Sequence, residues 1–136
     1  DLGLQPSGGN VGIGETAPGS ALHISSHDAG AAGPVLTLEH DSASPANSDV
    51  IGKIRFLADN DSGGSEEWAH IRSEIADVRG SEEDGKLIFS TVVGDTDTDT
   101  MTLYDGNVTI NSTGALVLTP RSTPTATEGQ IYYETE

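Results

Sequence analysis

Cysteine is absent from the 136-residue chain, which excludes disulfide bonds and thiolate metal sites. The sequence also lacks any run of 18 apolar residues, so we expect no membrane-spanning helix and no membrane insertion. No signal peptide pattern is visible. The first residue is Asp1 rather than methionine, which a fragment or a processed product would explain.

Basic residues are scarce, with six Lys and Arg against 22 Asp and Glu and a formal net charge of −16. Such a chain repels phosphates instead of neutralising them, which excludes nucleic acid as a partner and disfavours an anionic membrane surface. An acidic, lysine-poor balance is typical of halophilic proteins, because molar salt shortens the screening length to about 3 Å. The plainer alternative is an acidic, soluble surface.

Large apolar residues are also few. Leu, Ile, Val and Phe together make up roughly a fifth of the chain, close to the level of about 20% at which highly charged sequences stay disordered. A domain of about this size buries only about two thirds of its unfolded surface even with an ordinary core. We therefore expect oligomerisation to supply part of the missing burial.

Alternation of apolar and polar residues dominates the middle of the chain, over 52–58, 67–75, 85–91 and 100–104. This period of two is typical of half-buried strands. Polar turn clusters separate the segments at 59–65, 79–84 and 94–99. The pattern predicts an all-β fold, either an antiparallel meander or a β-sandwich.

The predicted sheet core consists of the residues that share one face of these strands: Ile54, Phe56, Ala69, Ile71, Ile75, Leu87, Phe89, Met101 and Leu103. A helix over 68–78 is the alternative, because Ile71, Ile75 and Val78 also fit a helical period. We favour a strand there, since Ala69, Ile71 and Ile75 follow the alternation of their neighbours.

A glycine-rich stretch near the N-terminus reads GGNVGIGETAPGSALHI, residues 8–24. It lacks the Gly-Lys-Ser/Thr of a P-loop, so we expect no phosphate site. Gly12 and Gly14 alternate with Val11 and Ile13, and glycine inside a strand indicates that another backbone approaches closely. The Gly-Asn-Val of this stretch recurs at 106–108, where Asp-Gly predicts a hairpin turn.

This stretch resembles a motif of the tail fibres and related appendages of tailed viruses. The run Gly-Asn-Val-Gly-Ile-Gly at 9–14, Pro18 and the Leu-His-Ile at 22–24 match that motif in order and spacing, whereas Glu15 stands where threonine is common. Later parts of such fibres are similar to the segments at 52–56, 68–75, 85–89, 101–103, 114–121 and 128–133. Each of these is a generic β pattern when taken alone.

The resemblance implies a homotrimeric fibre or spike of intertwined β-strands that carries no catalytic activity and serves host attachment. It implies an extended trimer-forming segment at 1–50, a sheet module at 51–111 and a C-terminal β segment or linker at 112–136. The residues expected to line the trimer are Val11, Gly12, Ile13, Gly14, Leu22, Ile24, Leu36 and Leu38.

The same resemblance implies a location on the virion, with other tail or capsid proteins and a host receptor or glycan as partners. We expect the turns at 59–65 and 94–99 to contact the receptor, because loops on a rigid scaffold commonly carry recognition.

Two acidic stretches are candidate calcium ligands. Asp59 and Asp61 begin a sequence like a calcium loop, but its twelfth position is His70 instead of a bidentate glutamate. Asp95, Asp97 and Asp99 alternate with threonine; on a strand they would repel one another, and in a loop they could wrap a cation. We favour solvated turns at both places and expect no cofactor, with calcium as the alternative.

Two other functions remain as alternatives. A cell-surface adhesin domain would use calcium, and a polysaccharide-degrading tailspike fragment would use a pair of carboxylates. Acids are so abundant that no pair stands out, and one Trp, three Tyr and two Phe give little aromatic surface for a sugar. No Ser-His-Asp arrangement and no histidine spacing typical of metal sites is visible. We therefore do not expect an enzyme.

Overall fold

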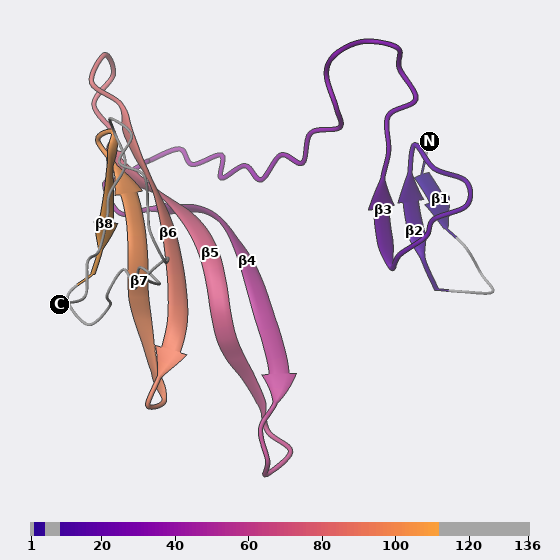
Figure 1. Cartoon of the computed structure of the whole chain (residues 1–136). Coiled ribbons are helices and arrows are strands. Elements are labelled where there is room, and N and C mark those ends of the chain that lie inside the picture. The colour runs from indigo at the N-terminus through magenta and orange to yellow at the C-terminus, as the bar shows by residue number, and fades with distance from the viewer. Residues whose placement is uncertain (1, 5–8, 112–136) are drawn as a thin grey trace, which may run out of the picture. The chain divides into compact units, whose positions relative to one another are not determined.

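The computed structural model describes residues 2–4 and 9–111 (Figure 1). The regular structure of these residues is entirely β, which confirms the predicted all-β class. The chain divides into two compact units, residues 1–37 and 38–136. The predicted C-terminal segment at 112–136 lies outside the described residues.

The first unit is a small three-stranded sheet in the order β1-β2-β3. Strand β1 (Leu2–Leu4) pairs antiparallel with β2 (Val11–Ile13), and β2 pairs parallel with β3 (Leu22–Ile24). The loop 14–21 makes the parallel crossover, and it is shorter than the dozen or so residues that such connections usually need. A loop this short must fold tightly over its own strands.

Glycine is required at two positions of this tight unit. A Cβ on Gly12 would collide with the backbone carbonyl of Glu15, and one on Gly14 would collide with the carbonyl of Ser25. Gly14 also has a φ of +73°, which side chains disfavour. The predicted close approach of a backbone is therefore present, from the loop at Gly12 and from the residue after β3 at Gly14. A further role for these glycines at a three-fold axis stays a prediction.

Side chains of the same stretch close the loop. The Asn10 amide donates a hydrogen bond to the carbonyl of Pro18 over 3.1 Å. Nδ1 of His23 accepts a hydrogen bond from the amide of Gly19 over 3.3 Å. The spacing of asparagine, glycine, proline and histidine in this stretch thus follows from one compact strand–loop–strand unit.

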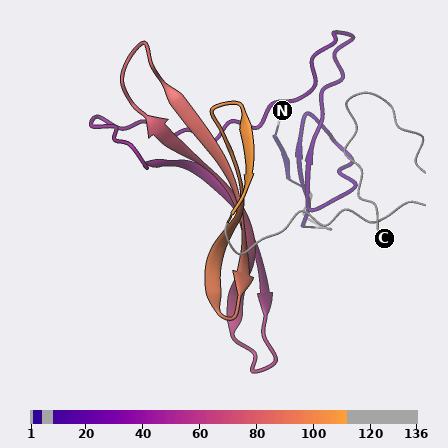
Figure 2. The ribbon, with the colours of Figure 1, turned by 60° about the vertical axis from the view of Figure 1, so that its left-hand side comes forward.

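The second unit is a single five-stranded antiparallel sheet with the strands in chain order. Its strands are β4 (Val50–Asp59), β5 (Ser65–Asp77), β6 (Asp84–Val93), β7 (Thr96–Tyr104) and β8 (Asn107–Ile110). Figure 2 shows that this sheet is one strongly twisted layer. The structure is therefore the predicted meander and, within the described residues, no second layer makes it a sandwich.

The strand favoured for 68–78 is confirmed, and its helical alternative is wrong, because β5 runs through almost all of this range. The turn predicted at 94–99 is wrong, because β7 begins at Thr96. A two-residue turn suffices there: Gly94 and Asp95 have φ values of 54° and 61°, the pattern of a hairpin turn that matches strand twist.

One face of the five-stranded sheet, here called the apolar face, carries the predicted core residues. Directly paired residues point to the same side of a sheet. Pairing therefore aligns one continuous row across all five strands: Ile54, Ile71, Phe89, Met101 and Ile110. The adjacent row adds Leu87, Leu103 and Val108, and Phe56 pairs with Ala69 on the other side of the first row.

The opposite face, here called the polar face, carries charged side chains from β4, β5 and β7. Among the described residues the one fully buried large apolar side chain is Ile88, which is 3% exposed. It lies on the polar face opposite Arg72, whose long side chain helps to cover it. The described part of the chain thus has a sheet but no enclosed hydrophobic core.

Candidate functional site

The apolar face leaves large side chains exposed in the single chain. Phe56 is 52% exposed, Ile54 46% and Val108 66%. A contiguous apolar surface that spans five strands is unusual for a monomer and marks an interaction site. This face is the first candidate functional surface of the chain.

Leu38, one of the residues expected to line the trimer, contacts this face in its own chain. A Cβ on Gly52 would lie 2.7 Å from the Cβ of Leu38, so the leucine occupies the space that glycine leaves open. The absence of a side chain at Gly52 therefore makes room for Leu38 at the β4 end of the apolar face.

The other predicted trimer-lining residues all lie in the first unit. Val11 and Ile24 are half-buried and Gly12 is buried, whereas Ile13, Leu22 and Leu36 are 42%, 54% and 62% exposed. Their exposure leaves apolar surface for a partner, and their role in a trimer stays a prediction.

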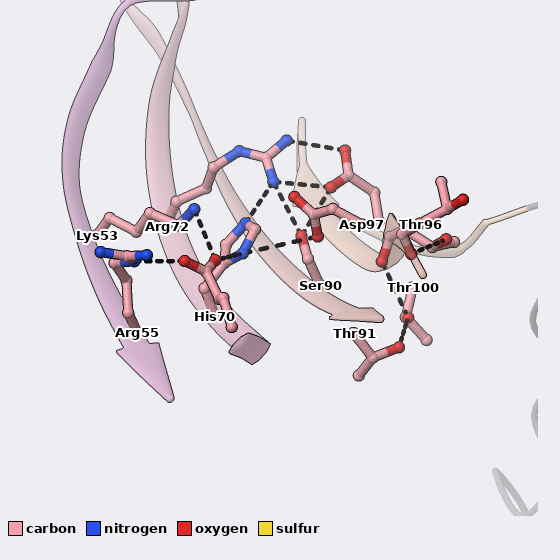
Figure 3. Close-up of polar contacts among 12 residues, drawn as sticks. Lys53, Arg55, His70, Arg72, Ser90, Thr91, Thr96, Asp97 and Thr100 are labelled. Carbon is pink, nitrogen blue, oxygen red and sulfur yellow. Dashed lines mark hydrogen bonds and ion pairs between the residues drawn. The ribbon is translucent and has the colours of Figure 1, made fainter. Parts of the chain in front are cut away.

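The polar face holds the second candidate, a network of charged groups centred on Arg72 of β5. Its guanidinium binds both carboxylate oxygens of Asp99, over 2.7 and 2.8 Å, and donates to Ser90 over 2.9 Å. Its Nε donates to Glu74 over 2.6 Å. Figure 3 shows the Arg72 side chain of β5 beside Ser90 of β6 and His70. One arginine thereby cross-links three strands.

This bidentate contact shifts the pKa values of both partners. Hydrogen bonding to the Arg72 guanidinium lowers the pKa of Asp99, and the hydrogen bond from Ser90, 2.7 Å long, acts in the same direction. The hydrogen bond to Asp99 raises the pKa of Arg72. Both groups therefore stay ionised over the neutral range, and the pair persists as a charged clamp.

His70, only 2% exposed, lies between the two halves of the network. Its Nε2 is 2.8 Å from Nη1 of Arg72. A guanidinium can only donate, so Nε2 must accept and the ring proton must reside on Nδ1. That Nδ1 lies 2.6 Å from Oε1 of Glu67. The two atoms are close, but their geometry is not that of a well-aligned hydrogen bond.

Glu67 joins the edge strand to the network. Its carboxylate accepts from Lys53 over 2.8 Å and from Nε of Arg55, both on β4. Hydrogen bonds from Lys53 and then Arg55 lower the pKa of Glu67 to about 2. The network therefore continues from β4 through β5 and β6 to β7 on one face.

The lowered pKa of Glu67 predicts an acid-dependent loss of stability. A depressed carboxylate pKa contributes stability that is complete above the ordinary value of 4.5 and disappears as the pH falls toward about 2. We expect Glu67→Gln to be less stable than the wild type at pH 7 and this difference to shrink between pH 4.5 and 2, as measured by urea unfolding at one fixed chain concentration.

The control for this experiment is Glu39→Gln, which removes an exposed carboxylate outside the network. Comparison with this control separates the Glu67 contacts from the general relief of repulsion in a chain of charge −16. A Glu67→Gln difference that stayed constant over this pH range would contradict the prediction.

A shallow hollow opens on the polar face, lined by Lys53, His70, Arg72, Asp97, Thr98 and Asp99. It brings a serine, a histidine and an aspartate close together, but their connections differ from those of a hydrolase triad. Ser90 donates to Asp99, and Nε2 of His70 faces Arg72 instead of the serine hydroxyl. In this arrangement the imidazole has no free nitrogen with which to take the serine proton.

The first pair of candidate calcium ligands, Asp59 and Asp61, lies at the hairpin between β4 and β5. Asp59 ends β4 and Asp61 lies in the following hairpin, where the side-chain oxygen of Asn60 accepts from the amides of Ser62 and Gly64. Within the described residues no group of three His, Cys, Asp or Glu side chains is suited to hold a metal ion.

The other acidic stretch, 95–99, is divided by the start of β7 at Thr96. Asp95 lies in the turn, whereas Asp97 and Asp99 lie on the polar face of the strand. Arg72 binds Asp99, and the imidazole of His70 is 3.7 Å from Asp97. The repulsion expected between aspartates on one strand face is thus relieved at Asp99 by the guanidinium of Arg72.

The local sequence pattern does not reveal this network. Arg72 and Asp99 are 27 positions apart, and only the register of β5, β6 and β7 brings them together. A partial signal existed, because His70, Arg72 and Glu74 alternate onto one strand face. Nothing in the local pattern indicated which strand would supply the counter-ions.

Comparison with known proteins gives no relative. No family model, curated protein or solved structure matches the chain. In the described part of the chain, no helix has the length and apolar character required to span a bilayer.

Proposed function

We propose that this chain is a non-catalytic structural module of a fibre or spike on a tailed virus, which assembles as a homotrimer and takes part in host attachment. The observation that carries the proposal is the apolar face. A sheet that exposes a row of large apolar side chains across five strands is stabilised when similar surfaces cover it. The appendage-like motif at 9–24 favours a viral fibre over other assemblies.

Covering the face would also offset the shortage of core material in each chain. Fully burying a large apolar side chain contributes roughly 1.5–3 kcal/mol relative to leaving it exposed. Copies that pack their apolar faces together leave the polar face turned outward. The rigid charged network and the hairpin at 59–65 then lie on the surface that is free to meet a receptor, a glycan or another virion protein.

The acidic surface fits a virion from a saline habitat. Carboxylates on neighbouring copies repel one another, and high salt screens that repulsion. We therefore expect assembly to strengthen with salt, because both screening and the salting-out of apolar surface act in the same direction.

The test is the molar mass in solution. We expect three times the chain mass of 14.0 kDa, with the trimer more resistant to dilution at about 1 M than at about 0.1 M NaCl, where the screening lengths are roughly 3 and 10 Å. Light scattering after size-exclusion chromatography measures this directly. A cooperative, folded monomer under both conditions would refute the trimer.

A further inference from the structure

Residues 34–38 form an extended segment that has the sequence of a strand but no strand partner. The run Pro-Val-Leu-Thr-Leu is rich in residues that favour sheets. Within the described part of the chain, the backbone of this segment makes no hydrogen bond. Val35 is 81% exposed and Leu36 is 62% exposed. The segment therefore offers both unpaired backbone groups and apolar side chains.

Strand β4 offers the complementary feature, an open edge. It is the first strand of the sheet and has ten residues, with no partner on its outer side among the described residues. Ile54, Phe56 and Leu57 on it are 46%, 52% and 50% exposed. A long edge strand with exposed apolar residues is a site where another strand adds.

The side-chain patterns of the two elements match. Leu36 and Leu38 alternate with Thr37, as Ile54 and Phe56 alternate with basic residues on β4. In the chain itself Leu38 lies over Gly52, and Nδ1 of His40 is 3.1 Å from the carbonyl of Val50. Moving from residue 38 to residue 40 therefore corresponds to moving from residue 52 back to residue 50. The segment thus runs antiparallel to β4, and this register puts its leucines on the apolar face.

The chain's own β4 is available to the segment at the highest effective concentration. Even so, within the described residues the backbone of 34–38 makes no hydrogen bond to that strand. A chain that carries an unpaired strand and an open edge is complementary to another copy of itself. Such a head-to-tail contact closes into a ring under rotational symmetry. We propose that the 34–38 segment of one copy adds antiparallel to the outer edge of β4 in the next copy.

This inference rests on the proposed trimer and adds the segment that links its subunits. The absence of cysteine allows a clean cross-linking test. Full-length Leu36→Cys chains are mixed with Ile54→Cys or Phe56→Cys chains, co-assembled and oxidised. We expect a disulfide between position 36 of one chain and position 54 or 56 of another chain, because the Cβ atoms at these positions would lie on the same face.

The matched control is Arg55→Cys, whose side chain lies on the opposite face of the same strand. We expect loss of the cross-link with this variant and no cross-link when any single variant is oxidised alone. The double variants Leu36→Cys/Ile54→Cys and Leu36→Cys/Phe56→Cys test the competing arrangement, because pairing within one chain would give an internal disulfide and no linked pair.

The outcomes separate the two proposals. A trimer by molar mass without cross-linking at 54 or 56, or with an internal disulfide in either double variant, would overturn the strand exchange and leave the proposed function intact. A monomer by molar mass would overturn both. Thr37→Pro gives an independent measurement, because it removes a ladder hydrogen bond; we expect it to lose trimer, whereas Ala31→Pro outside the segment keeps it.

Discussion

Phe56→Asp is expected to abolish assembly, whereas Leu57→Asp leaves it intact. The two residues are neighbours on β4 and are 52% and 50% exposed in the single chain. They point to opposite faces, since Phe56 pairs with Ala69 and Leu57 pairs with Glu67. Both substitutions therefore perturb the isolated sheet to a similar degree, and only the first places a carboxylate in the proposed interface.

Burying an unpaired charge costs several kcal/mol, and each subunit of the trimer would carry one. We expect the association constant to fall by at least ~100-fold for Phe56→Asp. Sedimentation or light scattering over a dilution series measures the change, and circular dichroism checks that both variants keep their sheet. Equal assembly of the two variants, or loss in both, would argue against the apolar face as the interface.

Arg72→Met is expected to be the most destabilising single change on the polar face. The methionine keeps much of the apolar stem over Ile88 but removes the donor of Glu74 and of the acceptor nitrogen of His70. Asp99 keeps only the hydrogen bond from Ser90. Hydrogen bonds to charged groups contribute about 1.5–3 kcal/mol each, and these side chains retain some access to water. We therefore expect a loss of roughly 2–3 kcal/mol in the free energy of unfolding.

Arg79→Met is the matched control, because Arg79 pairs with Asp77 and Glu82 at an exposed turn. Surface ion pairs of this kind contribute about 0–1 kcal/mol. Arg72→Lys adds a second comparison, since lysine keeps the charge but cannot bind a carboxylate through a planar fork. If denaturant unfolding gave the same small loss for Arg72→Met and Arg79→Met, the network would not hold the strands together.

Several features of the fold could be predicted from local sequence. The alternation around Ile54, Ile71 and Phe89 predicts both the strands and the face they share, because side chains on a strand alternate between two sides. The Asp-Gly at 105–106 predicts a tight hairpin, and both residues have positive φ values, 50° and 70°. Each of these inferences depends on only a few consecutive residues.

The acidic run at 94–99 shows where local reasoning fails. Aspartate and threonine in alternation, after a glycine, are typical of a turn. In the structure, pairing with β6 extends the strand to Thr96, and the guanidinium of Arg72 on β5 holds Asp99. Strand propensity depends on neighbours across the sheet, so a tertiary contact overrides the local preference here.

The sequence by itself determined the all-β class and the separation of an apolar from a polar face, because a period of two is a local property of the chain. The structure decided between the meander and the sandwich. Only the tertiary structure decided that Arg72 would meet Asp99 and that Gly14 would be crowded by the carbonyl of Ser25. Both contacts depend on the register and return path of segments that are separate in sequence, and no local pattern encodes those distances.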